Sequence, residues 1–463
     1  MRACAAAVAS RAVSVSEIAR VTLERIERVD PELQAFTFLD AEAILAEARR
    51  LDAKVARRRH SPGRLLGVPL GVKDLFDVRG FPTSYGTRAF EPHLPAADAA
   101  AVGRLRDADA LIIGKTRTAE LAWSTDTPPT KNPRDSRLIP GGSSGGSGAA
   151  VGASLVHAAL GTDTGGSVRI PAALCGVVGL KPTYGAVGRT GVLPASWSLD
   201  TVGPLARSVD DVRVVLAALV AHDPGHPAST APAIVEPLEE SLAWPAPLTL
   251  RGLRLGVLTE PLFEIVEDRA RSAHERLLQL LADEGVQLVS LDFPEAEFVP
   301  AALIAIDFAE SAAVHTERLR DRPAEIDDGI RALLNVAHAI PGALVARAHQ
   351  VRRAISQRMA TLFRTWELDA VVLPANAAPA IPRDELDTVF RRATGSRELA
   401  LWSYPRVFWL ASLTGQPAVV IPTVPEPPPL AVQLVGRPFE DGRVLDLAAA
   451  LEELLPVDAV PSG

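Results

Sequence analysis

Two stretches rich in glycine and serine, Pro140-Gly-Gly-Ser-Ser-Gly-Gly-Ser147 and Gly161-Thr-Asp-Thr-Gly-Gly-Ser-Val-Arg169, decide how the rest of the sequence is interpreted. Fourteen of the 33 glycines lie between positions 141 and 191, about a ninth of the chain. Glycine loses much backbone entropy on folding, so this density indicates tight turns or a close backbone approach. A flexible linker does not fit, because the apolar run Ala-Ala-Val-Gly-Ala follows at 149–153.

Several common functional motifs are absent or do not fit the sequence around them. The first stretch matches Gly-x-Ser-x-Gly twice, centred on Ser143 and Ser144, but that elbow should follow an apolar strand and residues 135–140 are not one. A phosphate loop ending at Gly114-Lys-Thr116 would need glycine where Asp109 stands. The nine histidines show no metal-ligand spacing, and no Gly-x-Gly-x-x-Gly follows a strand.

The second stretch and one lysine have the chemistry of a catalytic site. After the apolar run 155–160, the small residues 164–167 would let backbone amides converge on one point, as in an oxyanion hole, with the Ser167 hydroxyl beside it. The alternative is a tight turn capped by Ser167. Lys73 ends the apolar run 65–72, and partial desolvation there would make it a base near neutrality. The alternative is a lysine that reaches solvent or pairs with Asp74 or Asp77.

Hydrophobic periodicity favours an α/β fold. A capping box at Ser14-Val-Ser-Glu17 begins a helix over 15–29 that stops before Pro31, and a second helix covers 41–58. Short apolar runs predict strands, and helical patterns alternate with them. Predicted strands lie at 65–72, 111–113, 155–160, 176–180, 254–258, 369–373, 418–421 and 430–435, and predicted helices at 208–220, 265–284, 300–366 and 441–455.

The clearest candidate linker lies at 222–250, where six prolines fall between Pro224 and Pro247. We expect it to be an excursion within one domain over 1–463, with a helical region at about 260–366 on the substrate side. The alternative is a boundary between two domains.

Composition limits the classes of partner. The chain has 463 residues, 48% hydrophobic and 22% charged, and a net charge of −8 without a long basic run. Nucleic acid is therefore not expected as the main partner, because phosphate binding needs a concentrated positive patch. The basic residues comprise five lysines and 43 arginines, which makes each lysine worth examining.

Two features predict a cytoplasmic protein without membrane segments. Cys4 and Cys175 are the only cysteines, too few for a disulfide framework or a zinc cluster. No run of 18 apolar residues occurs. The N-terminus resembles a signal peptide faintly, at Ala7-Val-Ala9, but its apolar part is short and leads into a helical pattern.

Together these segments resemble the amidase signature family. The two stretches, Gly179-Leu-Lys-Pro-Thr-Tyr-Gly185 and Ser198-Leu-Asp-Thr-Val-Gly-Pro204 stand in that family's order and spacing, and the resemblance covers about 14–455. It implies one large α/β domain with a twisted mixed sheet of about eleven strands covered by helices on both faces. It implies no metal and no cofactor.

The resemblance also implies a triad of two serines and a lysine. Lys73 matches the family's lysine, Ser143 the serine that follows a cis peptide bond, and Ser167 the nucleophile. The backbone amides of Thr164, Gly165, Gly166 and Ser167 match the oxyanion hole. Ser144, Asp163 and Arg169 would support the site, with Asp163 and Arg169 paired to hold the loop.

Aromatic residues suggest an apolar acyl or aryl pocket, unless they belong to the core. They are Trp123, Trp197, Trp402 and Tyr404, with Phe408 and Trp409 nearby. With this pocket, the expected activity is hydrolysis of small hydrophobic or aryl amides.

Other functions stay open. A carbamate or urea-type hydrolase or an aryl esterase would use the same triad. A glutamine amidase subunit of a tRNA amidotransferase would need an acidic residue for the glutamine amino group, and residues 401–413 contain none. A scaffold that binds without catalysis is a further alternative. The expected partner is a small amide, ester or carbamate, and a homodimer is a common assembly for a chain of this size.

Overall fold

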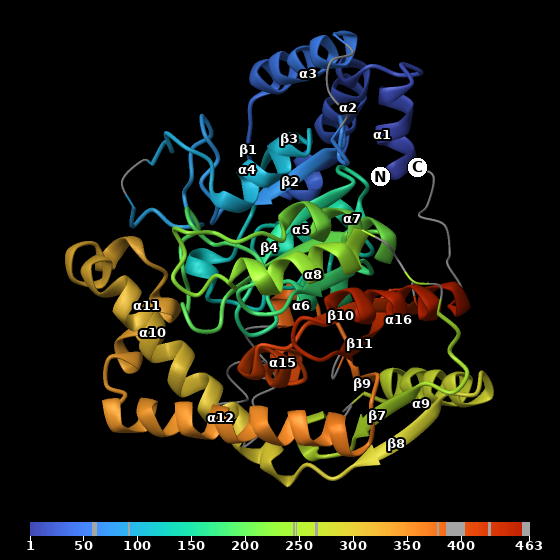
Figure 1. Ribbon diagram of the computed structural model, residues 1–463. Helices are drawn as coiled ribbons and strands as arrows, with labels where there is room; N and C mark the ends of the chain where they lie inside the picture. Colours follow the sequence, from blue (N-terminus) through green and yellow to red (C-terminus); the bar gives the residue numbers. More distant parts are fainter. Residues whose placement is uncertain are drawn as a thin grey trace.

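One mixed sheet of eleven strands runs through the computed structural model (Figure 1). The structure describes residues 1–57, 63–90, 93–243, 246, 248–263, 267–376, 379–385, 403–424 and 427–455. In sheet order the strands are β1 (Phe36–Leu39), β3 (Leu111–Thr116), β2 (Pro69–Lys73), β4 (Ala158–Asp163), β6 (Thr201–Ala206), β5 (Val178–Lys181), β10 (Ala418–Val424), β11 (Leu430–Val435), β9 (Ala370–Pro374), β7 (Arg254–Leu258) and β8 (Gln287–Leu291).

Strand direction brings two key segments to one edge of the sheet. Strand β2 pairs in parallel with both β3 and β4, so their carboxyl ends lie together. Lys73 is the last residue of β2, and Thr162 and Asp163 end β4. Ligands of α/β sheets commonly bind outside such carboxyl ends, which makes this edge the place to look for a site.

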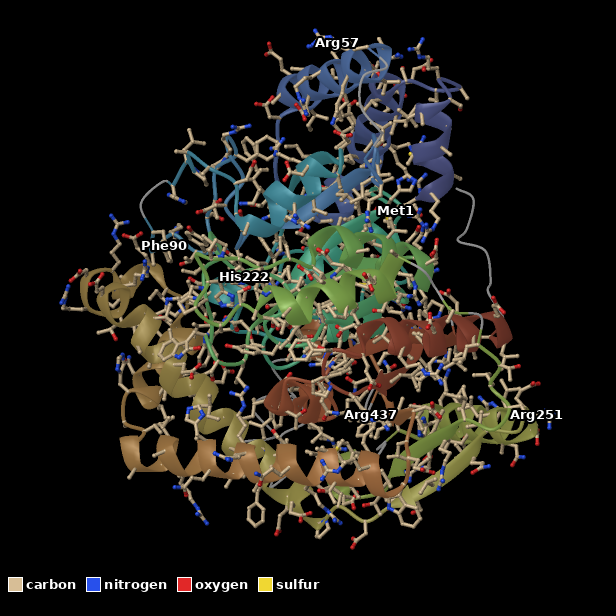
Figure 2. All side chains as sticks on the ribbon, viewed as in Figure 1. Met1, Arg57, Phe90, His222, Arg251 and Arg437 are labelled. Atoms are coloured by element: carbon tan, nitrogen blue, oxygen red, sulfur yellow. The ribbon has the colours of Figure 1, made fainter. Side chains whose placement is uncertain are left out.

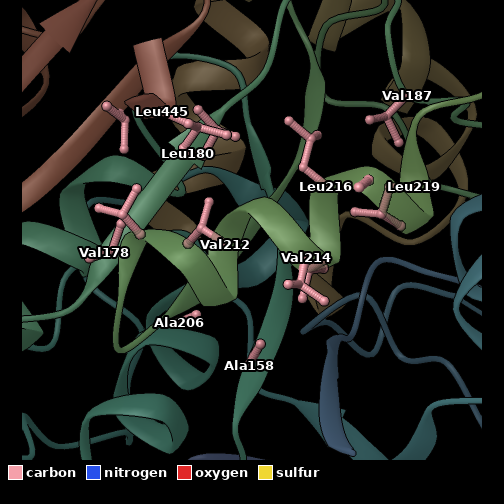
Figure 3. Close-up of a cluster of buried hydrophobic side chains, with 14 of the residues drawn as sticks. Ala158, Val178, Leu180, Val187, Ala206, Val212, Val214, Leu216, Leu219 and Leu445 are labelled. Atoms are coloured by element: carbon pink, nitrogen blue, oxygen red, sulfur yellow. The ribbon is translucent and has the colours of Figure 1, made fainter. Parts of the chain in front are cut away.

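One face of the sheet is covered by α4 (Ala100–Asp107), α7 (Val209–Leu219), α8 (Pro232–Ala243), α9 (Asp268–Asp283) and α16 (Asp441–Leu454). Figure 3 shows part of this core, where Val212 and Leu216 of α7 lie over Val178 and Leu180 of β5. Alternate strand residues point to this face, as the two-residue period of a strand requires. In β9, for example, Ala370 and Val372 pack here while Val371 and Leu373 pack on the other side.

The opposite face carries two helical groups. The first is α2 (Val15–Leu33), α3 (Ala41–Ala56), α5 (Gly145–Gly152) and α6 (Arg169–Cys175). The second is α10 (Val299–Asp321), α12 (Gly342–Thr365) and α15 (Trp409–Thr414). Figure 1 shows α10 and α12 as the long helices of the lower left, with α11 (Asp328–Ala337) beside α10. Two short helices, α1 (Arg2–Ala9) and α14 (Ser403–Arg406), complete the described set.

These observations confirm the predicted fold class, a large mixed sheet with helices on both faces. Several predicted boundaries are wrong, and two of them have a clear physical reason. Helix α2 continues through Pro31 to Leu33, because a proline in the last turn removes only one N–H, and the Asp30 carboxylate then accepts the amide of Ala35 at 2.7 Å. Within the apolar run 65–72, strand β2 begins only at Pro69, because Pro69 is the first residue that pairs with β3, opposite Leu111.

The proline-rich segment 222–250 contains a helix that its composition did not predict. Helix α8 buries Val235, Leu238 and Leu242 against α7 and α16. Strands from before and after this segment share the one sheet. That the whole chain forms a single domain stays a prediction.

One straight stretch of the described chain, Pro294–Asp321, is long and apolar enough to cross a membrane, and half of its most apolar window is buried inside the protein. The core helix of a water-soluble protein passes the same test. The stretch is therefore weak evidence for a membrane protein.

Basic residues occur both at the surface and in the interior, where Arg169 and Arg213 are among the largest buried side chains. Arginines such as Arg57 and Arg251 project from the periphery (Figure 2). Three of the five lysines, by contrast, are fully buried: Lys73, Lys115 and Lys181. Burying an ammonium group is expensive unless it is paired or neutral, so each of these lysines requires an explanation.

Candidate active site

Lys73 lies at the carboxyl end of β2 and has no exposed surface, more deeply buried than its sequence suggested. Its Nζ donates hydrogen bonds to Ser143 Oγ and Thr162 Oγ1, each at 2.8 Å. Burial lowers the pKa of Lys73 to about 7, against the opposing effect of Asp200 and Asp163. A large fraction of Lys73 is therefore neutral near pH 7, as a general base must be.

The predicted alternatives for Lys73 do not occur. It does not reach solvent, and Asp74 pairs with Lys115 instead, at 2.7 Å. Asp77 contacts His93 at 3.0 Å. The ion pair with Asp74 compensates for the burial of Lys115, whereas among the described residues Lys73 Nζ donates only to hydroxyl groups.

Ser143 follows a cis peptide bond from Gly142 and is fully buried. Only glycine fits before it, because a Cβ at position 142 would lie 2.5 Å from the Ser124 carbonyl oxygen. No strand precedes this loop, as the sequence indicated, and α5 begins directly after Ser144. The loop therefore leads Ser143 to Lys73 rather than exposing it on a nucleophile elbow.

Ser144 joins the two glycine-rich loops. Its backbone N–H donates to the Ser167 carbonyl at 3.2 Å, and its hydroxyl donates to the Thr162 carbonyl at 3.3 Å. These contacts fix the loop of Ser143 against the loop of Ser167. The sequence offered Ser144 as one of two elbow centres, and the structure gives it this supporting position.

The second loop is organised around the Asp163 carboxylate. Asp163 and Arg169 form a fully buried ion pair at 2.8 Å, as the sequence predicted. The carboxylate also accepts the amides of Gly166 at 3.0 Å and Val168 at 3.2 Å. Burial alone would raise the pKa of Asp163, but Arg169 and these amides hold it below its usual range. The loop is thus wrapped around a fixed anion.

This arrangement corrects the predicted oxyanion hole at one position. The Gly166 N–H already donates to Asp163, so it does not point at a substrate oxygen. Gly165 and Ser167 both line the adjoining cavity, and among the described residues their amides have no acceptor. Thr164 lines it too, and its hydroxyl donates to Asp200 at 2.6 Å. The candidate hole is therefore formed by Thr164, Gly165 and Ser167.

The cavity in front of Ser167 has a volume of about 200 Å³. The Ser167 hydroxyl makes no hydrogen bond with the residues that the structure describes, so it is free to meet a ligand. Most of the cavity wall is apolar. The described lining residues are Ala122, Trp123, Ser124, Thr125, Thr164, Gly165, Ser167, Ile170, Ala195, Leu303, Ile304, Asp307, Phe308, Leu333, Pro405 and Trp409.

Only one of the four predicted pocket residues is found in the wall of this cavity among the residues that the structure describes. Trp123 lines the cavity and packs against Phe308 with ring centroids 4.7 Å apart. Trp197 does not line this cavity. It is 49% exposed and, together with Tyr184, lines a separate cavity. Trp402 and the side chain of Tyr404 lie outside the described residues. Sequence reasoning missed Asp307 and Phe308, which no local motif marks within helix α10.

The described residues include no cluster of three or more His, Cys, Asp and Glu side chains placed to hold a metal ion. The chemistry that they can perform is proton transfer from a hydroxyl to Lys73 and stabilisation of an oxyanion by backbone amides. Both would act on a carbonyl carbon placed beside Ser167.

We expect Asp163→Asn to lower the free energy of unfolding by about 3–5 kcal/mol, because it leaves Arg169 charged and unpaired in the interior. Activity should fall with it, since the loop amides lose their anchor. Thermal or denaturant unfolding and steady-state rates would measure both. The control is Asp210→Asn, which removes an exposed ion pair with Arg2 and should change little. Wild-type stability and rate in Asp163→Asn would contradict the anchoring role.

Comparison with known proteins gives matches over almost the whole chain. A family model described as Amidase matches residues 17–445. A glutamyl-tRNA(Gln) amidotransferase subunit of Acidothermus cellulolyticus is 36% identical, over 97% of this chain and 92% of its own length. An amidase of Pseudomonas putida is 34% identical, over 96% of this chain and 93% of its own. A crystal structure of an amidase matches with a TM-score of 0.84 at 31% identity, covering 98% of this chain and 99% of that one.

Proposed function

The chain belongs to the amidase signature family, a family of serine amidohydrolases that act on C–N bonds, and we propose that it hydrolyses small apolar or aryl amides through an acyl-enzyme on Ser167. The observation that carries the proposal is the buried Lys73, within 2.8 Å of Ser143 Oγ, in a loop tied to that of Ser167. A serine hydroxyl is a weak nucleophile and needs such a base nearby.

The proposed reaction needs no histidine. Neutral Lys73 takes the Ser143 proton while Ser143 takes the Ser167 proton, and Ser167 Oγ bonds to the carbonyl carbon. The amides of Thr164, Gly165 and Ser167 stabilise the oxyanion, with each donor typically worth about 2.7–4 kcal/mol. Ser143 then protonates the departing nitrogen and takes its own proton back from Lys73 as the C–N bond breaks. Water hydrolyses the ester formed on Ser167 by the same relay, which returns the proton to Ser167.

The cavity supports an apolar substrate. Trp123, Phe308 and Trp409 supply aromatic surface, and Leu303 and Ile304 supply aliphatic surface beside Ser167. Ligand sites that are mostly apolar with a few placed polar groups bind small molecules by burying their surface. Hydrophobic acyl groups and aryl amines fit this description better than peptides with several charges.

A partner-dependent glutamine amidase is the second candidate, because relatives such as the Acidothermus cellulolyticus protein are named as subunits of an amidotransferase. Glutamine carries a carboxylate as well as an ammonium group, and a buried carboxylate needs a cationic or multiply donating partner. The described cavity wall contains no Lys, Arg or His. Because the described wall has no cation to pair with a carboxylate, it favours substrates that lack one.

A substrate panel tests the proposal on the purified chain without added proteins. The panel is a short aliphatic amide, glutamine, a nitroanilide, a nitrophenyl ester and an aryl carbamate. We expect turnover of the nitroanilide and the ester, and little of glutamine. A carbamate strongly preferred to the matching amide would support the carbamate hydrolase instead. Glutamine turnover appearing only with partner proteins would support the transamidase role, and no turnover by folded protein would support a binding scaffold.

The assembly of the chain stays a prediction. The homodimer expected from chain size can be checked by light scattering of the same preparation. A dimer that hydrolyses amides without other proteins would agree with an independent enzyme.

A further inference from the structure

One acidic side chain, Asp307 of α10, interrupts the apolar wall of the cavity in front of Ser167. Among the described lining residues it is the only one with an ionisable side chain. It lies near the middle of a long helix, between the apolar cavity residues Ile304 and Phe308. A carboxylate in such a place loses hydration and needs a compensating partner.

Few groups of the described structure stabilise a negative charge on Asp307. Its one hydrogen-bond contact is with the Ser311 hydroxyl at 3.4 Å, and that hydroxyl donates at the shorter distance of 2.7 Å to the Ala195 carbonyl. No ion pair of the described residues includes it. Desolvation in its partly buried position, together with the nearby carboxylates of Asp200 and Glu310, raises the pKa of Asp307 to about 7.

The two neighbouring carboxylates are already satisfied, unlike Asp307. Asp200 accepts the Thr164 hydroxyl at 2.6 Å and lies 3.5 Å from Arg189. Glu310 accepts the Ser196 hydroxyl at 2.5 Å and the Ser198 amide at 3.0 Å. Three acids thus lie close together beside the cavity, and Asp307, the one that lines it, has no hydrogen bond shorter than 3.4 Å among the described residues.

We propose that Asp307 binds a cationic nitrogen of the substrate, so that the amide hydrolysed at Ser167 has an apolar body that carries an ammonium group. The inference rests on the proposed function and names a specificity-determining residue for it. A bound ammonium would neutralise Asp307 and relieve its repulsion with Asp200 and Glu310. The hydrogen bond would be charge-assisted, the strongest kind available to an amine.

The proposal distinguishes three kinds of substrate. A neutral apolar amide lacks this charge-assisted contact and should bind more weakly than its ammonium counterpart. An amino acid amide or an amide of an ω-amino acid offers the required ammonium. A substrate with a carboxylate beside its ammonium group would bring that carboxylate near the negative charge of Asp307, and the described wall residues include no cation to pair with it. Glutamine is such a substrate, so it lies outside the preferred class.

The test compares nitroanilides in matched pairs, with and without an ammonium group. One pair is 6-aminohexanoyl and hexanoyl nitroanilide, and the other is leucyl and 4-methylpentanoyl nitroanilide. At pH 8, Asp307→Asn should lower kcat/KM for the ammonium member of at least one pair by roughly 10- to 100-fold, as loss of a charge-assisted contact predicts. The neutral members should change by less than about threefold, since they make no such contact.

Asp321→Asn is the matched control, because it removes the same charge from the exposed end of the same helix, where Asp321 pairs with Arg320. It should leave both members of each pair unchanged. Equal losses for ammonium and neutral substrates in Asp307→Asn, or no loss in either, would overturn the inference while leaving hydrolysis at Ser167 intact.

Binding without catalysis separates this inference from the proposed function. Calorimetry with n-hexylammonium should show binding to the wild-type protein and at least about tenfold weaker binding to Asp307→Asn. Equal affinity, or no binding to either protein, contradicts the ammonium site. Specific binding combined with no hydrolysis of any nitroanilide would contradict the enzyme and keep the site.

Discussion

Ser167→Ala is expected to lower kcat by about 10⁴-fold or more for every substrate that the enzyme turns over, because no acyl-enzyme can form without the attacking oxygen. The fold should remain, since the Ser167 hydroxyl makes no hydrogen bond among the described residues and replacing it leaves no donor or acceptor unpaired. Steady-state rates on the nitrophenyl ester and nitroanilide would measure the loss. Thermal unfolding of the same samples would confirm that the variant is folded.

The control for this prediction is Ser356→Ala. Ser356 lies on α12, away from the described wall of the cavity, and its hydroxyl donates to the Arg352 carbonyl within the same helix. It should keep the wild-type rate. A Ser167→Ala protein that retains more than a hundredth of the wild-type rate would contradict the nucleophile assigned to this loop.

Lys73→Met should lower kcat by about 10²- to 10⁴-fold, the usual contribution of a general base. Lys73→Arg should be as inactive, because a guanidinium stays protonated and offers no lone pair to Ser143. Rates on a neutral nitroanilide, again with thermal unfolding, would measure both variants. Substantial activity in Lys73→Arg would contradict a proton-accepting role.

The same lysine predicts how the wild-type rate depends on pH. Burial lowers the pKa of Lys73 to about 7, so the protonated form dominates below that pH and cannot accept a proton. With a neutral substrate, kcat/KM should rise with pH, pass its midpoint near pH 7 and then level off. A rate that falls as pH rises from 6 to 8 would contradict the assignment.

Lys181 and Asp307 provide controls for that midpoint, because burial also places the pKa of each near 7. Lys181 Nζ donates to the Pro182 carbonyl at 2.9 Å and contacts neither serine. If the midpoint belongs to Lys73, it should survive in both Lys181→Met and Asp307→Asn. Its loss in either variant would assign the pH dependence to that group.

Most residues of the candidate site could be predicted from the sequence only because they lie in recognisable motifs. Lys73, Ser143 and Ser167 lie far apart along the chain, and no spacing rule joins them. They could be predicted as a group because the two glycine-rich loops resemble those of one family. The parallel pairing of β2 and β4 brings Lys73 and Thr162 to the same edge, where Lys73 contacts Ser143, and Ser144 ties that loop to the loop of Ser167.

Other parts could not be predicted because they depend on where loop atoms point. The sequence offered four amides for the oxyanion hole, but the Asp163 carboxylate takes the Gly166 amide. Asp307 lay within the region predicted to be helical and on the substrate side, but no motif marked the residue, and its place in the cavity depends on how α10 packs over the sheet. Trp197, an aromatic residue near a motif, is half exposed and lines a separate cavity instead.

The most direct test of the account is to trap the acyl-enzyme and find where it forms. Wild-type protein mixed with a slowly released nitrophenyl ester should gain the mass of one acyl group, and peptide mapping should place that group on Ser167. Ser167→Ala treated in the same way should gain none. An acyl group on another residue, or rapid turnover without any acylated protein, would contradict the mechanism.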